Sequence, residues 1–573
     1  MPFPYRAALS SVVLAMLVGA CAGPSPREVP ANSGAAGETT APRAPKRITI
    51  ATRGEPYGLN SKARLSGPGG SVHALEHMAN AGLTIVDGSG EPRPQLAEAV
   101  PTLDNGLWKL FPDGRMETTW TLKAGAQWHD RAPITAEDLL FTAEVERDRE
   151  VPINRPTGSD ALESVRAIDG RNVVATWRRP YIDADLLFTS ELASLMPRHL
   201  LEKAYREDKA TFLQLPYWTT EYVGAGPYVL KEWVIGSHLV LAANPDYLLG
   251  RPRIDEIVAR FIADSNTLVA NVLAGAVELN LGSGLSTEQG IQIRDQWREG
   301  KVELPPSGWL VVHPQLLNPT PTVLGNVQFR RALLHAIDRQ ALVDTVQYGV
   351  TSVAHSILDP DQPQYREIQQ SVVRYEYDPR RAQQMIEALG NSRGADGVYR
   401  DSAGARLSVE LRTVPQNTVY EKGVLAVADY WQQAGVGVDA QVIAVQRARD
   451  REFRATFPAF EILGTPNDVV GALNLHSVKA RLPENDFVGS NYPRYMNPEY
   501  DAIVDRYLVT IPKAERIQVL GQMIRHVADQ VLAMGLFHDT TPFAIGSRLQ
   551  NVAPGRAAGT SEAWNVAEWD VRS

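Results

Sequence analysis

Two histidines and a glutamate near the start of the chain have a spacing that could bind a metal ion. His73, Glu76 and His77 form the pattern His-x-x-Glu-His, which places two imidazoles one helical turn apart. A protein zinc site needs at least three ligands, and the sequence does not identify the third. So short a pattern also arises by chance in a long chain. A zinc metallopeptidase is therefore one alternative, and we expect no enzyme activity, no metal, no cofactor and no catalytic residue.

A lone cysteine follows an apolar run at the N-terminus. Arg6 precedes the run, residues 7–20, which ends in small residues directly before Cys21. The run is shorter than the about 20 apolar residues of a membrane-spanning helix, so it predicts a signal peptide over residues 1–20. Small residues before a cysteine resemble a bacterial lipobox, which implies lipid attachment at Cys21. An ordinary secretory signal with an incidental thiol is the alternative.

The segment after the signal, residues 21–46, is predicted to be a flexible tether. It contains five prolines among small and polar residues and little that could form a core. A flexible chain of this length reaches about 25–30 Å, enough to hold a folded body off a bilayer. We therefore expect an extracytoplasmic, lipid-anchored protein in the periplasmic space or at the outer face of the cytoplasmic membrane.

The composition excludes several classes of protein. Lys and Arg total 57 and Asp and Glu total 66, giving a net charge of −9, and no block of like charges appears. Nucleic-acid binding needs a clustered basic surface, which this sequence lacks. A single cysteine excludes an intrachain disulfide framework and any site built from several cysteines. With 44% apolar residues, the chain can form a large folded core.

Strand and helix patterns alternate along the body and predict an α/β protein. In residues 257–279 a β-branched run is followed by a helix that Asp264 or Ser265 can cap and Gly275 can stop. Residues 407–442 read as an alternating strand, a helix with one apolar face, and a second strand, which should be parallel to the first. Asp338 can cap a helix that begins at residue 339. These patterns alone name no ligand.

Separated sequence blocks between residues 81 and 501 follow one order and share a family likeness. They are Ala81-Gly82-Leu83-Thr84, Leu96-Ala97-Glu98, Trp120-Thr121-Leu122-Lys123-Ala124-Gly125, Pro133-Ile134-Thr135-Ala136-Glu137-Asp138, Pro197-Arg198-His199-Leu200, Gly224-Ala225-Gly226-Pro227-Tyr228, Asn244-Pro245-Asp246-Tyr247, Phe329-Arg330-Arg331-Ala332 and Asn497-Pro498-Glu499-Tyr500-Asp501. The series resembles the family 5 extracellular solute-binding proteins, which include the dipeptide- and oligopeptide-binding components of ATP-binding-cassette importers.

The resemblance implies a two-lobed periplasmic-binding-protein-like (type II) fold with an inserted extra subdomain. The lobes close around a ligand by a hinge motion. We expect the following parts: a core of lobe I from residues 46–85, 221–305 and 527–573, an inserted subdomain of lobe I at 86–220, and lobe II at 306–526.

Some positions in these blocks carry structural predictions. Trp120 and Trp128 alternate with polar residues on presumed strands, so we expect both in the core. Arg131 stands where the family usually has glycine, which predicts a different turn or local strain.

Ligand-binding residues are chosen from what a peptide needs: a carboxylate for its amino terminus and a cation for its carboxyl terminus. Asp468, in a polar turn with Asn467, lies where peptide-binding relatives often place an aspartate; a solvated turn or cap is the alternative. Arg412 is on the polar side of its strand and could meet a carboxylate, with an ordinary salt bridge as the alternative. The candidates are Asp468, Asn467, Arg412, Arg53, Asn60 and Tyr420.

The sequence predicts a monomeric binding protein that delivers a ligand, most simply a peptide, to an importer. Because no nucleotide-binding loop is present, a membrane permease and ATPase subunits must be separate partners. The same scaffold could instead bind an oligosaccharide, an opine-like compound or a nickel chelate. Nucleic acid is not an expected partner.

Overall fold

The computed structural model describes residues 44–63, 71–155, 159–282, 284–415, 417–555 and 560–572. The expected signal peptide, Cys21 and nearly all of the tether lie outside these residues. Residues 45–573 form one compact unit, to which everything below refers. Within the described part of the chain, no helix combines the length and apolar character needed to cross a bilayer.

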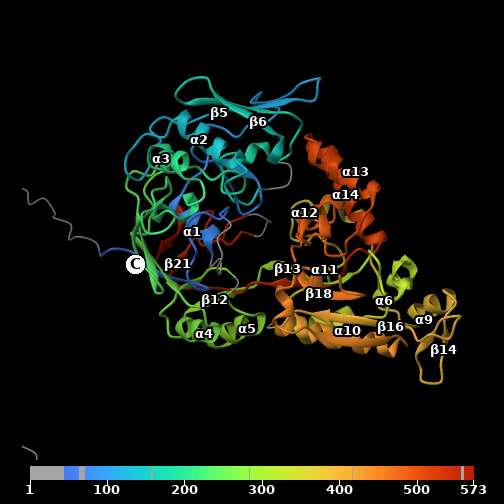
Figure 1. Ribbon diagram of the computed structural model, residues 1–573. Coiled ribbons are helices and arrows are strands. Elements are labelled where there is room, and N and C mark those ends of the chain that lie inside the picture. The colour runs from blue at the N-terminus through green and yellow to red at the C-terminus, as the bar shows by residue number, and fades with distance from the viewer. Residues whose placement is uncertain are drawn as a thin grey trace, which may run out of the picture. The chain divides into compact units, whose positions relative to one another are not determined.

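A seven-stranded sheet contains the first strand of the body. Its strand order is β12-β20-β11-β1-β10-β9-β8, and β1 runs parallel to both β10 and β11. The strands are β1 (Arg47–Thr52), β8 (Tyr228–Val234), β9 (His238–Ala243), β10 (Glu256–Phe261), β11 (Leu279–Asn280), β12 (Gly300–Glu303) and β20 (Phe543–Gly546). Helices α4 (Ser265–Leu273) and α5 (Thr287–Gln296) lie next to each other beside this sheet (Figure 1).

A five-stranded sheet has the order β17-β16-β18-β13-β19. The strands are β13 (Pro306–Pro314), β16 (Ser408–Thr413), β17 (Gly437–Val442), β18 (Phe460–Thr465) and β19 (Met534–Thr540). Helix α10 (Thr418–Gln433) packs against β16, β17 and β18. Figure 1 shows α10 beside β16 and β18. The parallel pairing of β16 with β17 confirms the strand–helix–strand unit predicted for residues 407–442.

The chain passes between these two sheets at two neighbouring points. One connection joins β12 to β13, and the other joins β19 to β20. The backbone N–H of Thr541 donates to the carbonyl of Pro305 at 3.1 Å, so the two connections touch. Strand β19 still pairs with β13 in the five-stranded sheet, so the chain returns to the seven-stranded sheet only after residue 540. The division expected from the sequence placed this return at residue 527.

A third sheet, with the order β4-β5-β7-β6, lies within residues 108–177. Its strands are β4 (Trp108–Leu110), β5 (Met116–Thr121), β6 (Leu162–Ala167) and β7 (Asn172–Trp177), and helices α2 (Ala136–Arg147) and α3 (Arg198–Glu207) pack together beside it. Trp120 and Trp128 are buried in one apolar cluster, as predicted. Arg131 has φ of 70°, so the position where the family usually has glycine does require a left-handed backbone.

The remaining elements are short sheets and helices. The paired strands are β2 (Thr84–Val86) with β3 (Pro92–Pro94), β14 (Ser392–Arg393) with β15 (Tyr399–Arg400), and β21 (Leu549–Gln550) with β22 (Asp570–Val571). The helices are α1 (Val72–Ala79), α6 (Val327–His335), α7 (Arg339–Val346), α8 (Tyr365–Ile368), α9 (Pro379–Ala388), α11 (Arg451–Ala455), α12 (Val469–Leu473), α13 (Pro498–Val509) and α14 (Lys513–Asp529).

Helix starts follow local signals in the sequence. Asp264 accepts a hydrogen bond from the backbone N–H of Thr267 and caps α4, and Gly275 ends the unit with φ of 68°. Asp338 caps α7 through the N–H of Ala341. These predictions are therefore confirmed.

Candidate functional site

A groove of about 360 Å³ is lined by two separate parts of the chain. One wall comes from residues 86–92 and 182–191. The other comes from residues 362–364, 468–473 and 507–517. The walls meet where the N–H of Ile182 donates to the carbonyl of Leu508 at 3.3 Å. A cleft of this size, with apolar surface and a few converging charges, is the usual form of a small-ligand site.

Asp468 stands on the wall of this groove, at the start of α12. Its carboxylate accepts a hydrogen bond from the N–H of Gly471 at 3.0 Å, which makes it the N-cap of the helix. Burial raises the pKa of Asp468, and the backbone N–H groups of the helix start oppose that shift only in part. Asp468 also lines the groove. It is thus a helix cap at the edge of the candidate site.

A buried polar network holds the turn before Asp468 in place. The side-chain amide of Asn467 donates to Asp359 at 3.2 Å, and the N–H of Asp359 donates to the carbonyl of Asn467 at 3.0 Å. The Asp359 carboxyl also lies 3.2 Å from Nδ1 of His538, and both side chains are buried. Asn467 therefore positions its neighbour, and sequence reasoning gave no sign of Asp359 or His538.

The groove also contains cations and further acids. Lys513 forms an exposed ion pair with Glu91 at 2.9 Å, which joins the two walls. Burial raises the pKa of Asp183, while the charge of Arg516 partly opposes the shift. Burial, together with the charge of Asp183, raises the pKa of Asp185 to about 7. The wall from residues 507–517 thus offers positive charge opposite an acidic segment.

Arg412 does not line the groove; it forms the salt bridge that was the alternative expected from the sequence. The residue is only 1% exposed, so the polar side of its strand is buried at this position. Nε donates to Glu461 at 3.2 Å, and the guanidinium also donates to the carbonyl of Phe453 at 2.8 Å and stacks over the Phe453 ring. The carboxylate that Arg412 meets is the chain's own, because β18 pairs with β16 and places Glu461 next to Arg412, while Phe453 and Arg454 of α11 contact the guanidinium.

Three other candidates also lie outside the described lining of the groove. Arg53 is exposed just after β1, and Asn60 is buried and accepts a hydrogen bond from the N–H of Lys62 at 2.9 Å. Tyr420, on α10, places its hydroxyl against the backbone of Gly464. The structure therefore brings together Asp468 and Asn467 but does not bring these three to the same cavity.

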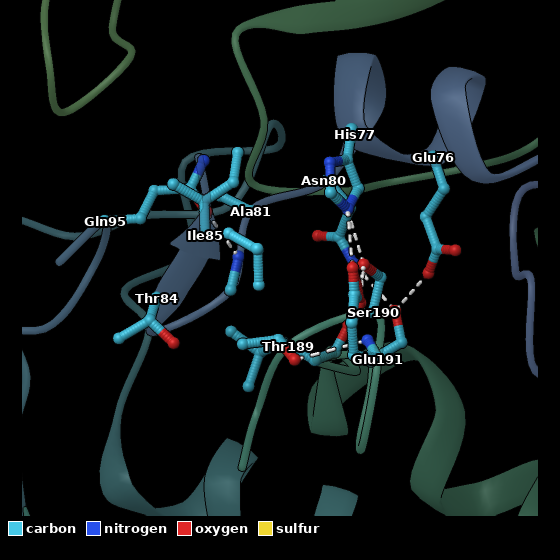
Figure 2. Close-up of a pocket in the computed structure, with 14 residues that line it drawn as sticks. Glu76, His77, Asn80, Ala81, Thr84, Ile85, Gln95, Thr189, Ser190 and Glu191 are labelled. Atoms are coloured by element: carbon cyan, nitrogen blue, oxygen red, sulfur yellow. Dashed lines mark hydrogen bonds and ion pairs between the residues drawn. The ribbon is translucent and has the colours of Figure 1, made fainter. Parts of the chain in front are cut away.

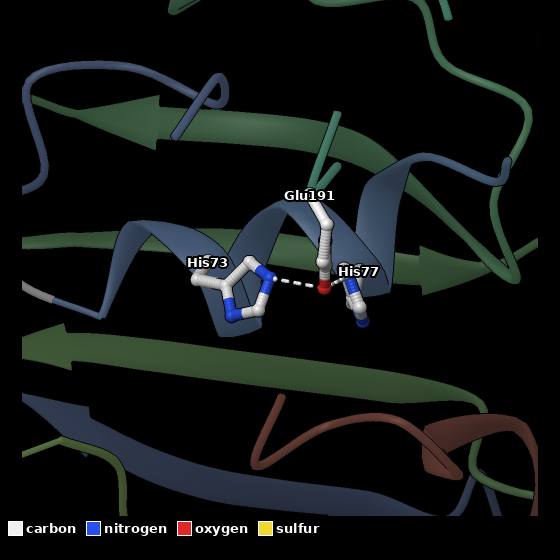
Figure 3. A group of neighbouring side chains, drawn as sticks. All are labelled: His73, His77 and Glu191. Atoms are coloured by element: carbon white, nitrogen blue, oxygen red, sulfur yellow. Dashed lines mark hydrogen bonds and ion pairs between the residues drawn. The ribbon is translucent and has the colours of Figure 1, made fainter. Parts of the chain in front are cut away.

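The histidines of the His-x-x-Glu-His pattern meet a distant glutamate. His73 and His77 lie on one face of α1, and Glu191 reaches them from the segment before α3 (Figure 3). Glu191 Oε1 is 3.0 Å from Nε2 of His73 and 3.9 Å from Nε2 of His77. Sequence reasoning missed Glu191, which is separated from His73 by 118 positions and belongs to no recognisable motif.

Glu76 of the same pattern is turned into the protein. It is buried and accepts hydrogen bonds from the N–H of Ser61, at 2.9 Å, and from the hydroxyl of Ser194. Figure 2 shows Glu76, His77 and Glu191 around a small cavity of about 20 Å³. The Glu76 carboxylate is thus held by donors of the protein itself.

The family profile described as "Bacterial extracellular solute-binding proteins, family 5 Middle" matches residues 91–474. The oligopeptide-binding protein AppA of Bacillus subtilis is 24% identical over 576 residues, covering 97% of this chain and 97% of that protein.

Solved structures share the fold at lower identity. The structure of Bacillus subtilis AppA with a nonapeptide has a TM-score of 0.69 and 21% identity, covering 92% of this chain and 100% of the other. The structure of NikA from Brucella suis with Fe(III)-EDTA has a TM-score of 0.73 and 17% identity, again covering 92% and 100%. The two-lobed type II fold with mixed α/β layers is thereby confirmed.

Proposed function

Because the chain belongs to the bacterial extracellular solute-binding proteins, family 5, we propose that it captures a peptide between two lobes and passes it to an ATP-binding-cassette importer. In this proposal the protein acts by binding and not by catalysis. Cys21 carries the lipid that anchors a monomer at the membrane, and residues 21–46 serve as the tether. The partners are a permease and ATPase subunits.

Sheet membership supports a division into lobes close to that expected from the sequence. Lobe I comprises residues 46–305 and 541–573 and includes the seven-stranded sheet, with the four-stranded sheet in its inserted part, 86–220. Lobe II comprises residues 306–540 and includes the five-stranded sheet. The touching connections at Pro305 and Thr541 then form the hinge.

The observation that carries the peptide proposal is the groove between these lobes, with Asp468 on one wall. A peptide amino terminus would place its ammonium group against the Asp468 carboxylate in a charge-assisted hydrogen bond. Arg516 or Lys513, further along the same wall, would meet the terminal carboxylate. Lobe closure would bring Asp183 and Asp185 over the bound chain, where their carboxyl groups can accept from backbone N–H groups.

A non-peptide ligand is the alternative, because NikA shares the fold and was solved with Fe(III)-EDTA. The charge of the groove distinguishes a peptide from an anionic metal chelate. The groove is lined by five carboxyl groups and two cations. The carboxyl groups are those of Glu91, Asp183, Asp185, Glu191 and Asp468. An excess of acids favours a zwitterionic or cationic ligand over an anionic chelate.

The decisive experiment compares Asp468→Asn with the parent protein in calorimetric titrations against a library of di- to hexapeptides. Asparagine keeps the helix cap, since its side-chain oxygen still accepts from Gly471, but it removes the negative charge. We expect peptide affinity to fall about 10- to 100-fold, the value of a hydrogen bond to a charged group. Asp338→Asn is the matched control, because Asp338 caps α7 in the same way outside the groove.

Three outcomes distinguish the proposals. Peptide binding that Asp468→Asn weakens and Asp338→Asn leaves unchanged supports the peptide proposal. Unchanged peptide binding in both variants would show that Asp468 does not contact the peptide. Binding of sugars or metal chelates without any peptide binding would keep the fold and replace the ligand.

A further inference from the structure

The histidine cluster, which we define as His73, His77 and Glu191, has the donor set of a transition-metal site. Two imidazole nitrogens and one carboxylate oxygen lie within 4.8 Å of one another. No other group of three such donors converges in the described residues. Two histidines and a glutamate suit Zn²⁺, which takes nitrogen and oxygen ligands and accepts three from the protein with an open fourth position.

The spacing of the donors fits an ion of this size. In a tetrahedral site with bonds of about 2.0–2.1 Å, neighbouring donor atoms are about 3.3–3.4 Å apart. Glu191 Oε1 lies 3.0 Å from one Nε2 and 3.9 Å from the other, values on either side of that spacing. Small rotations of the side chains would therefore bring all three donors to one ion.

Surrounding groups orient the glutamate toward the histidines. The Ser190 hydroxyl donates to Glu191 Oε2 at 2.8 Å, while Oε1 faces both imidazoles (Figure 3). The N–H of Glu191 donates to the hydroxyl of Thr189 at 3.2 Å, and Lys62 donates to the Glu191 backbone carbonyl. Such outer contacts fix the direction of a metal ligand.

An ion would replace contacts that the cluster makes within itself and with its neighbour. Nε2 of buried His77, the nitrogen nearest Glu191, contacts the Ser190 hydroxyl, and Nε2 of His73 pairs with Glu191 at 3.0 Å. An ion can also enter, since the His73 side chain is 35% exposed and Glu191 lines the ligand groove.

We propose that His73, His77 and Glu191 bind one divalent transition-metal ion, with Zn²⁺ the best fit. The proposal is independent of the peptide function and assigns no hydrolysis, because Glu76 is enclosed by Ser61 and Ser194. It revises the expectation, drawn from the sequence, that the chain has no metal site.

The test is calorimetric titration of metal-free protein with ZnCl₂. The protein should carry no histidine tag, and metal should be removed on a chelating resin, because the related fold of NikA was solved with an EDTA complex. We expect one Zn²⁺ per chain. His73→Ala and Glu191→Gln should each weaken binding at least about tenfold, since each removes a ligand.

A matched control is His199→Ala. His199 forms a similar histidine–carboxylate pair with Asp130 at 2.7 Å, but no third donor joins it among the described residues. This variant should bind Zn²⁺ like the parent protein. Visible absorption of the Co²⁺ form would report nitrogen and oxygen coordination, and it should be lost in both cluster variants.

Absence of Zn²⁺ binding to the parent protein would overturn the proposal. So would unchanged affinity in His73→Ala and Glu191→Gln, because the ion would then bind elsewhere. Circular dichroism of each variant establishes that it is folded. His73 is partly exposed, so its variant keeps the test valid even where Glu191→Gln fails to fold.

Discussion

The Arg412–Glu461 pair and the histidine cluster both combine acidic and basic side chains, but they differ in how completely their polar groups are satisfied. Glu461 is 0% exposed, and its oxygens accept from Arg412 at 3.2 Å and from Arg454 at 3.0 Å. In the histidine cluster, Nδ1 of His77 lacks a partner and His73 reaches solvent.

The difference separates a structural pair from a candidate binding site. Groups that satisfy one another inside the protein have no capacity left for a ligand, and their removal is felt as lost stability. Partly exposed groups such as the His73–Glu191 pair contribute little to stability and can exchange their contacts for an ion. Measurements of stability and of binding should therefore rank the two clusters in opposite orders.

The largest effect is expected for Glu461→Ala. This change leaves Arg412 buried without its carboxylate, so the free energy of unfolding should fall by about 3–5 kcal/mol. Urea denaturation monitored by circular dichroism measures it. Zinc affinity of the folded variant should not change, because Glu461 is on β18 and the histidine cluster is on α1 and the segment before α3.

Glu144→Ala is the control for that change. Glu144 pairs with Arg206 on the surface, with both side chains well exposed, so its loss should cost less than about 1 kcal/mol. If the two substitutions lower the free energy of unfolding equally, the buried Arg412–Glu461 pair contributes no more stability than an exposed pair. That result would contradict the contrast drawn between the Arg412–Glu461 pair and the histidine cluster.

An intermediate effect is expected for Glu146, which is buried like Glu461 but has an oxygen without a partner in the described structure, like His77. Burial raises its pKa to about 8, although the charges of Lys62 and Arg155 oppose the shift. The folded protein therefore holds a proton that the unfolded chain releases above its ordinary pKa near 4.5. The resulting stability is fully present below that value and is lost as the pH rises through about 8.

Glu146→Gln should remove this pH dependence. Relative to the parent protein, the variant should gain at least about 1 kcal/mol of stability between pH 5 and pH 8. Urea denaturation at several pH values tests this, with Glu144→Gln as the exposed control. A constant difference between parent and variant across the range would show that Glu146 is ionised in the folded protein throughout.

Local features of the fold could be predicted because they depend on neighbours in sequence. The cap at Asp264, the stop at Gly275 and the parallel unit around α10 each follow from short-range patterns. The left-handed backbone at Arg131 was indicated by the family pattern, which usually has glycine at this position. The pairing of β19 with β13 was not predicted, because the two strands are more than 200 positions apart in the sequence.

The sites were harder to predict because they depend on contacts between distant segments. An alternating strand pattern placed Arg412 on a polar face, but β18 brings Glu461 beside it and buries both. His73 and His77 were visible as a pattern, whereas Glu191 has no local signal and joins them only through the fold. Asp468 was found by family likeness, and its network with Asp359 appeared only in three dimensions.

The smallest change in stability is expected for His73→Ala in metal-free protein. The His73–Glu191 pair is partly exposed, so its loss should alter the free energy of unfolding by less than about 1 kcal/mol. Saturating Zn²⁺ should stabilise the parent protein by RT ln(1 + [Zn²⁺]/Kd) but leave the variant almost unchanged. If His73→Ala instead lowers the free energy of unfolding by several kcal/mol without metal, the histidine cluster is a structural contact like the Arg412–Glu461 pair. Only groups that already satisfy one another's hydrogen bonds and charges cost so much stability when one of them is removed.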